Sequence, residues 1–283
     1  MRIDELPQIR EVLQKSNLIA KKSLSQNFLF DLNLTLKIAN LNGSLINSTV
    51  LEIGPGPGAL TRALLASGVK KVIAIEKDKN FIPILKDIEK VYPNRLEIIE
   101  QDALTFNLEN LNHISNLKII SNLPYNIGTK LLINWLQPKT WPPIWRDMTL
   151  MFQKEVANRI VATHGTKSYG RLSILAQWRC SVKISMNLPP EVFRPVPKVY
   201  SSVVSIFAND RPQFTANPLI LEKIVKSGFN QRRKMLRSSL KKDNLNIEKI
   251  LLSSGIKSTL RAENLTISDW CNLARTIENY EKS

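Results

Sequence analysis

Apolar and polar segments alternate along the first two thirds of the chain in a way that predicts strands separated by helices. Short β-branched or apolar runs occur at residues 49–53, 71–75, 96–100, 117–121 and 148–152. Segments with helical periodicity lie between them, at residues 59–67, 78–92, 129–137 and 154–163. This alternation is typical of an α/β fold, a mostly parallel doubly wound sheet with helices on both faces.

The pattern changes after two further strand-like runs, at residues 182–187 and 200–207. An Asp-Arg-Pro tripeptide at residues 210–212 interrupts it, and shortly afterwards only helical periodicity remains. Proline and charged residues between periodic segments mark a linker. We therefore predict an α/β domain over residues 1–210 and a small all-α domain over residues 211–283.

Length and composition fit a protein with a buried core and no helix that spans a membrane. The chain has 283 residues, 43% of them hydrophobic, yet no apolar run approaches the ~18–20 residues that a membrane helix needs. The N-terminal segment lacks the apolar stretch of a secretory signal, so we expect a cytoplasmic protein. Two cysteines and two histidines, each far apart in sequence, predict neither a disulfide framework nor a metal site.

The charge balance favours a polyanionic partner. Forty Lys and Arg against 24 Asp and Glu give a formal charge of +16, which suits nucleic acid or an anionic membrane surface. A basic but otherwise ordinary enzyme is the alternative.

One stretch concentrates this charge. Residues 226–242, the basic segment, hold seven Lys or Arg and no acid. On a single helix Arg233, Arg237 and Lys241 would form one stripe, which suits contact with a nucleic-acid backbone. A solvated helix face is the alternative. The candidate nucleic-acid-binding residues are Arg232, Arg233, Lys234, Arg237 and Lys241.

A glycine-rich turn follows the first of the five strands. Gly54 and Gly56 let backbone N–H groups approach a ligand closely, and together with Ala59 they match the dinucleotide fingerprint. Glu76, at the end of the next strand, is placed to bind a ribose hydroxyl pair. NAD, FAD and S-adenosylmethionine all remain possible ligands, and a plain turn is the alternative.

Two details favour S-adenosylmethionine. Pro55 and Pro57 stiffen the glycine turn, whereas a pyrophosphate cradle benefits from an uninterrupted helix N-terminus. Asp102 follows the third strand, where its carboxylate can accept a hydrogen bond from an adenine amine. A turn cap is the alternative role for Asp102.

The fourth strand ends in Asn122-Leu123-Pro124-Tyr125. Ligands of doubly wound sheets lie outside the carboxyl ends of the strands, so this tetrapeptide should lie beside the glycine turn. The amine of a nucleobase is a poor nucleophile, and the Asn122 oxygen with a nearby backbone carbonyl could steer it. Proline fixes that backbone, and Tyr125 offers a stacking face. Phe193, in a loop stiffened by prolines, could stack on the same base or anchor the core.

These motifs resemble the ribosomal RNA adenine N6-dimethyltransferases over about residues 20–275. The matching segments, in the family's order, are 22–31, 52–58, Glu76, 101–103, 122–125 and 192–203. Residues 229–237 and 261–265 resemble the housekeeping branch that modifies small-subunit RNA. The resemblance implies a Rossmann-like S-adenosylmethionine-dependent methyltransferase fold. It also implies cofactor-binding roles for Gln26, Asn27, Leu29, Glu52, Gly54, Gly56, Glu76, Lys77, Asp102, Ala103 and Asn122.

The resemblance further implies the reaction. Asn122, Pro124, Tyr125 and Phe193 would form the catalytic site, with Tyr125 and Phe193 on either side of the target adenine. The expected reaction is dimethylation of two adjacent adenines near the 3′ end of 16S rRNA in the 30S subunit, by a metal-free monomer with a role in ribosome biogenesis. The alternatives are a nicotinamide-dependent oxidoreductase and a non-catalytic RNA-binding assembly factor.

Overall fold

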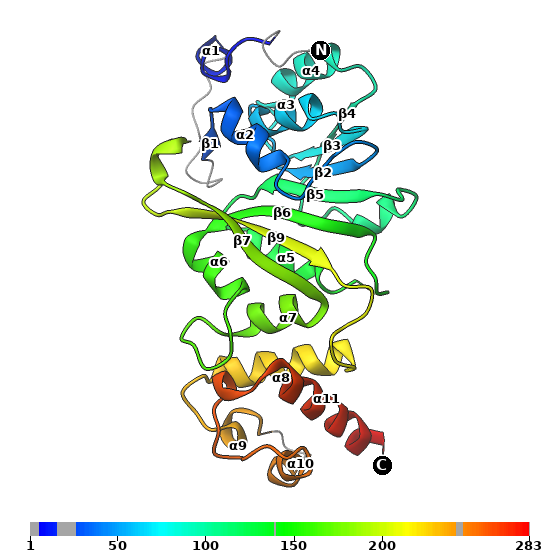
Figure 1. Ribbon diagram of the computed structural model, residues 1–283, viewed down its shortest axis with the longest axis vertical. Coiled ribbons are helices and arrows are strands. Elements are labelled where there is room, and N and C mark those ends of the chain that lie inside the picture. Colours follow the sequence, from blue (N-terminus) through cyan, green and yellow to red (C-terminus); the bar gives the residue numbers. More distant parts are fainter. Residues whose placement is uncertain (1–5, 16–26, 139, 242–245, 283) are drawn as a thin grey trace. The chain divides into compact units, whose positions relative to one another are not determined.

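The computed structural model describes residues 6–15, 27–138, 140–241 and 246–282 (Figure 1). The chain forms two compact units, neither of which is continuous in sequence. The first comprises residues 1–135, 142–157 and 183–208, and the second comprises residues 136–141, 158–182 and 209–283. The helical unit is therefore larger than the 211–283 domain predicted from the sequence.

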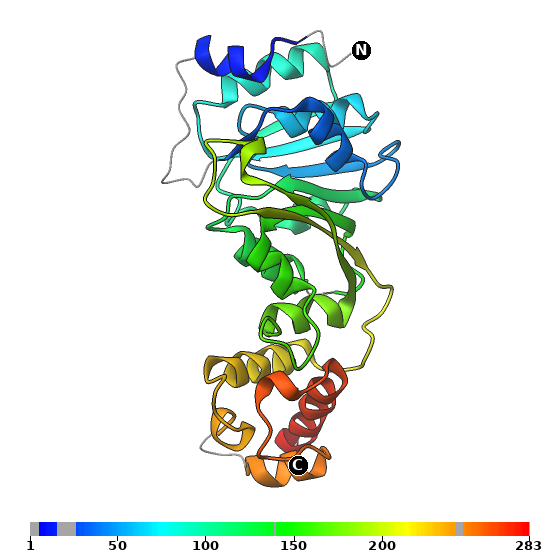
Figure 2. The same cartoon turned by 60° about the vertical axis from the view of Figure 1, so that its left-hand side comes forward.

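A seven-stranded sheet organises the first unit, in the order β4-β3-β2-β5-β6-β9-β7 (Figures 1 and 2). Its strands are β2 (Thr49–Ile53), β3 (Lys71–Glu76), β4 (Leu96–Glu100), β5 (Leu117–Asn122), β6 (Trp145–Gln153), β7 (Cys180–Leu188) and β9 (Ser201–Ala208). The first five of these in spatial order pair in parallel, whereas β9 runs antiparallel to β6. The predicted mostly parallel sheet is confirmed.

The central strands β2, β3 and β5 are buried at almost every position because both of their faces are covered. All five residues of β2 are buried, as is usual for strands of a parallel sheet between helices. One core cluster joins Val50 and Val72 of the sheet to Leu64 and Ile88 of the helices. The helices of this unit are α1 (Ile9–Lys15), α2 (Leu32–Ala39), α3 (Ala59–Ala66), α4 (Ile82–Val91) and α5 (Gly128–Trp135), and α6 (Lys154–Ile160) follows β6.

The strand order fixes where a ligand can bind. Strand β2 has β3 on one side and β5 on the other, so the chain reverses its direction of winding beside β2. Open α/β sheets bind their ligands at such a switch point, beyond the carboxyl ends of the strands. A short antiparallel pair, β1 (Phe28–Leu29) with β8 (Phe193–Arg194), brings two distant segments together in the same unit.

Helices form the second unit. They are α7 (Arg171–Arg179), α8 (Pro218–Asn230), α9 (Leu236–Ser239), α10 (Ile247–Ser253) and α11 (Ile267–Lys282). Its core joins Ile174 and Trp178 of α7 to Leu221 and Trp270, which explains why residues 158–182 group with the C-terminal helices. Helices α8 and α11 lie side by side (Figures 1 and 2). None of the helices in the described part of the chain is long and apolar enough to cross a membrane.

Candidate active site

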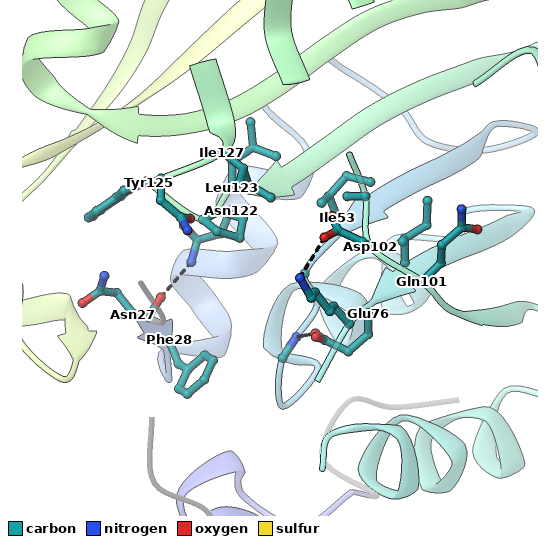
Figure 3. Close-up of a pocket in the computed structure, with 17 residues that line it drawn as sticks. Asn27, Phe28, Ile53, Glu76, Gln101, Asp102, Asn122, Leu123, Tyr125 and Ile127 are labelled. Carbon is teal, nitrogen blue, oxygen red and sulfur yellow. Dashed lines mark hydrogen bonds and ion pairs between the residues drawn. The ribbon is translucent and has the colours of Figure 1, made fainter. Parts of the chain in front are cut away.

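A pocket lies at the carboxyl ends of β2, β3, β4 and β5 (Figure 3), the usual place for a ligand of an open α/β sheet. Figure 3 shows Asn122 and Tyr125 on one side and Glu76 and Asp102 on the other. The structure brings most of the predicted site residues to this pocket: Asn27, Gly54, Gly56, Glu76, Lys77, Asp102, Ala103, Asn122, Pro124 and Tyr125.

The glycine turn after β2 folds onto the end of β3. Gly54 and Gly56 have φ values of 62° and 53°, in the left-handed region that favours glycine. A Cβ on Gly56 would stand 2.7 Å from the Phe28 ring. The Gly56 N–H donates to the Glu76 carboxylate at 3.0 Å. The absence of side chains therefore lets this turn approach both the ring and the carboxylate.

Glu76 keeps capacity for a ligand although its two oxygens already bind backbone. Oε2 accepts from Gly56 and Oε1 accepts from the Asp78 N–H at 2.7 Å. A carboxylate offers about four acceptor positions, so acceptor capacity remains for a ligand hydroxyl group. Burial raises the pKa of Glu76, and the N–H bonds from Asp78 and Gly56 offset part of that effect.

Asp102 has two partners within the protein. Its Oδ1 accepts from the Leu104 N–H at 2.9 Å, which is the turn-capping role that the sequence left open. Its Oδ2 pairs with the exposed Lys77 ammonium at 2.8 Å, and the hydrogen bond from Lys77 is the main reason that the pKa of Asp102 lies below its usual value. An amine that binds Asp102 would share this carboxylate with Lys77.

The side-chain amide of Asn122 is oriented by the chain itself. Its Nδ2 donates to the backbone oxygen of Asn27 at 2.9 Å (Figure 3). This bond turns the Nδ2 end of the amide toward Asn27, and no described residue donates to the Oδ1 end. The acceptor end of the amide is therefore the end left for a ligand in the pocket.

Tyr125 and the backbone before it complete this side of the pocket. The Tyr125 hydroxyl and the Ser201 hydroxyl lie 2.6 Å apart, which fixes the ring, and burial raises the pKa of Tyr125. The Pro124 carbonyl accepts N–H groups at the start of α5 and is thereby engaged. The carbonyl that directly precedes the proline belongs to Leu123, another lining residue.

Two predicted cofactor residues do not line the main pocket, and a third is not among the described residues. Gln26 is outside the described residues. Leu29 and Glu52 line a smaller cavity, which shares Gly54 and Asn122 with the main pocket. Glu52 accepts from the Thr61 hydroxyl at 2.7 Å. Burial raises the pKa of Glu52 to about 8, despite this hydrogen bond, which lowers it.

The buried Glu52 carboxyl should make stability depend on pH. Between 4.5, the ordinary pKa of a glutamate, and about 8, the pKa of Glu52 in the fold, the folded state holds a proton that the unfolded state releases. The free energy of unfolding therefore falls as pH rises through this window, by on the order of a few kcal/mol. Urea unfolding near pH 6 and near pH 9 should show a clearly smaller fall for Glu52→Gln than for the wild type. Equal falls would mean that Glu52 ionises normally.

Phe193 is a correction to the predicted site. Its side chain is 0% exposed and packs in the core with Leu29 and Leu188, and it does not line the pocket. The pairing of β1 with β8 places Phe193 opposite Leu29 and so carries the ring inward. This is the core-anchor role. A sandwich around the target base would require the ring to leave the core.

Sequence reasoning missed the apolar wall of the pocket. Ile53, Ile75 and Ile127 line it together with Phe28, which also makes an edge-on contact with Phe81 at 5.4 Å between ring centroids. Ile53 and Ile75 lie in strands, and their sequence context does not distinguish them from ordinary core residues. Gly56 was an indirect signal for Phe28, because a turn position without a side chain leaves room for a neighbouring ring.

The single helix predicted for the basic segment is wrong. Helix α8 ends at Asn230. Met235 forms an isolated antiparallel bridge with Arg261, and the Leu236 N–H donates to the Leu260 oxygen at 2.7 Å. These bonds to a distant segment replace the bonds of a continuous helix, so the predicted three-residue stripe does not form.

The five basic candidates also differ in their surroundings. Arg232 is partly buried, pairs with Glu263 at 2.6 Å and donates to the Thr166 oxygen, so it has a structural role. The others are exposed to solvent: Arg233, Lys234, Arg237 and Lys241.

The architecture is that of a known class of enzyme. A dimethyladenosine transferase from Plasmodium falciparum superposes with a TM-score of 0.75 and 26% identity, over 90% of this chain and 98% of that one. The 23S rRNA methyltransferase ErmE superposes with a TM-score of 0.63 and 24% identity, over 89% and 100% of the two chains, which supports the same fold. The fold and the pocket define a Rossmann-like methyltransferase.

Sequence comparison identifies the family. The family model described as ribosomal RNA adenine dimethylase matches residues 17–279. Relatives named ribosomal RNA small subunit methyltransferase A, from Paracoccus denitrificans and Ruegeria sp. (strain TM1040), are 54% and 53% identical, over 96% and 98% of both chains. The chain belongs to the ribosomal RNA adenine dimethylase family, which rules out the nicotinamide-dependent oxidoreductase considered above.

Proposed function

We propose that this protein transfers methyl groups from S-adenosylmethionine to the N6 amines of two adjacent adenines, two methyls to each. The proposed substrate is the 3′-terminal hairpin of 16S rRNA in the 30S subunit, and the protein acts as a cytoplasmic monomer in ribosome biogenesis. Family membership supports the reaction class. The observation that carries the proposal is the Asn122 amide, whose bond to Asn27 leaves an acceptor oxygen at the pocket.

The residues at the pocket fit this cofactor. The side-chain-free turn at Gly54 and Gly56 admits a ligand close to the backbone, Glu76 has acceptor capacity for a ribose hydroxyl, and Asp102 suits an adenine amine. When bound, the cofactor supplies a methyl group made electrophilic by its sulfonium.

The protein's contribution is to position the acceptor amine and adjust its electronics. The N6 lone pair is delocalised into the adenine ring, and acceptors for its two hydrogens draw the nitrogen toward tetrahedral geometry. We assign these acceptors to Asn122 Oδ1 and the Leu123 carbonyl. The nitrogen loses a proton to solvent after it gains the methyl group, so no strong base is required. The rate then comes from orientation and local electrostatics.

Replacement of Tyr125 by alanine should weaken RNA binding, because the proposed stack on the target base is lost. Stacking contributes ~1–3 kcal/mol per base, so the KM for RNA should rise roughly 5- to 150-fold. Tyr125→Phe keeps the ring and loses only the contact with Ser201, so its KM should rise only a few-fold. Equal KM values for the alanine variant and the wild type would exclude stacking on this ring.

Exposed charge in the basic segment should contribute to RNA affinity. Combining Arg233→Glu with Arg237→Glu should weaken binding and flatten the plot of log K against log salt, because each lost phosphate contact reduces the slope by about 0.7–0.9. Lys86→Glu with Lys90→Glu, two exposed positions on α4, changes net charge equally and is the control. An unchanged slope for the variant with both arginines replaced would show that the basic segment does not contact the RNA.

Label mapping tests the proposed reaction. The protein is incubated with tritiated S-adenosylmethionine and 30S particles that lack the modification, and the labelled nucleotides are identified. We expect label on two adjacent adenines near the 3′ end of 16S rRNA, recovered as N6,N6-dimethyladenine. Label on other nucleotides, or on protein alone, would refute the assignment.

A further inference from the structure

The loop before β9 exposes apolar side chains that the proposed reaction does not use. Val196, Val199 and Tyr200 are 54%, 43% and 52% exposed. Two prolines in the loop, Pro195 and Pro197, limit its backbone freedom. An aromatic ring kept half in solvent on a stiff loop is a typical surface for stacking a base.

Tyr200 lies at the same edge of the sheet as the proposed active site. The next residue, Ser201, pairs with Gln153 at the carboxyl end of β6, and β6 pairs with the strand that ends in Asn122. The hydroxyl of Ser201 lies 2.6 Å from that of Tyr125. The exposed ring and the hydroxyl that fixes the proposed adenine-stacking ring thus belong to consecutive residues, Tyr200 and Ser201.

A lysine accompanies Tyr200. The Lys154 N–H donates to the Tyr200 backbone oxygen at 2.9 Å, and the Lys154 ammonium lies 5.6 Å from the ring centroid. Lys154 is itself exposed. A cation over one face of an exposed ring leaves the opposite face for a base. It also places positive charge where the phosphate of that nucleotide can reach it.

We propose that Tyr200 is the stacking platform for the nucleotide next to the target adenine, with Lys154 beside that nucleotide's phosphate. This inference rests on the proposed function and adds a second nucleotide-binding position to it. While one adenine is held at Asn122 and Tyr125, the adjacent base rests on Tyr200. The neighbouring base then need not restack in the RNA, which keeps the target base available to the pocket. Stacking accepts any base, so this position contributes affinity without reading sequence.

The test compares Tyr200→Ala with two controls, Tyr200→Phe and Val199→Ala. Methyl transfer to 30S particles and cofactor affinity are measured for each. We expect Tyr200→Ala to raise the KM for particles about tenfold, as expected for one lost stack, with cofactor affinity unchanged. Tyr200→Phe keeps the stacking face, and Val199→Ala removes exposed apolar surface without a ring, so both should stay within about twofold of the wild type.

A second arm removes the base instead of the ring. Particles assembled with 16S rRNA that carries an abasic nucleotide beside the target adenine should raise the wild-type KM about tenfold. They should raise that of Tyr200→Ala little further, because both changes remove one contact. If Tyr200→Ala matches the wild type, or the two losses add fully, Tyr200 is not the platform and the proposed reaction still stands. If the wild type methylates no rRNA adenine, the proposed function fails and this inference fails with it.

Discussion

Replacement of Asn122 by alanine should lower kcat for methyl transfer on the order of 10²–10³-fold, the usual cost of losing one preorganised polar group at the reacting atom. In the wild type the Asn27 oxygen holds Nδ2 at 2.9 Å, so Oδ1 meets the amine without reorganisation. Alanine removes both this bond and the acceptor. Steady-state transfer of radiolabel to RNA measures the effect.

Asn126 provides the matched control. It is an exposed amide that lines the same pocket and has no role in the proposed chemistry. Asn126→Ala should keep kcat within a few-fold of the wild type, as an exposed substitution usually does. If both variants lose activity equally, the pocket is merely sensitive to substitution. An Asn122→Ala enzyme with near-normal kcat would show that the amine needs no side-chain acceptor.

Replacement of Glu76 by glutamine should raise the Kd for S-adenosylmethionine roughly 10- to 100-fold, because hydrogen bonds to a charged group contribute ~1.5–3 kcal/mol. Both Glu76 oxygens accept backbone N–H groups, from Gly56 and Asp78. A glutamine has only one acceptor oxygen and directs an NH₂ group at one of these donors. The ribose site and the glycine turn should therefore loosen together, and titration calorimetry reports the change.

Glu100→Gln is the control for the loss of one acidic charge. Glu100 ends the neighbouring strand β4 and pairs with Lys79 at 3.3 Å on the surface. Its replacement should leave the cofactor Kd within about twofold of the wild type, because exposed ion pairs contribute little. A similar rise in Kd for both variants would attribute the effect to net charge. An unchanged Kd for Glu76→Gln would show that Glu76 does not bind the ribose.

The sheet and much of the pocket were predictable because their signals are local. Each β-branched run is itself a strand, and residues that follow parallel strands converge at one edge of a sheet. Gly54, Glu76, Asp102 and Asn122 could therefore be grouped before any contact was known.

Features that depend on distant partners were not predictable. The basic segment has helical periodicity, yet Leu236 bonds to Leu260 and the helix is broken there. Phe193 lies in a loop-like sequence, but the pairing of β8 with β1 draws its ring into the core. Trp178 packs against the C-terminal helices, so residues 158–182 belong to the helical unit, although the sequence pattern places them in the α/β domain.

The orientation of the Asn122 amide also depends on a distant partner and was therefore not predictable. Its partner, Asn27, lies 95 residues earlier in the chain, and no sequence pattern indicates which end of the amide faces the pocket.

A structure of the protein bound to S-adenosylhomocysteine and an RNA that contains the target adenine would test the proposed role of the Asn122 amide in a single measurement. In the proposed complex, N6 of an unstacked adenine lies within hydrogen-bonding distance of Asn122 Oδ1 and about 3–3.5 Å from the position of the transferred methyl group. An adenine bound away from the end of β5, or an Asn122 side chain turned so that Nδ2 meets the base, would contradict it.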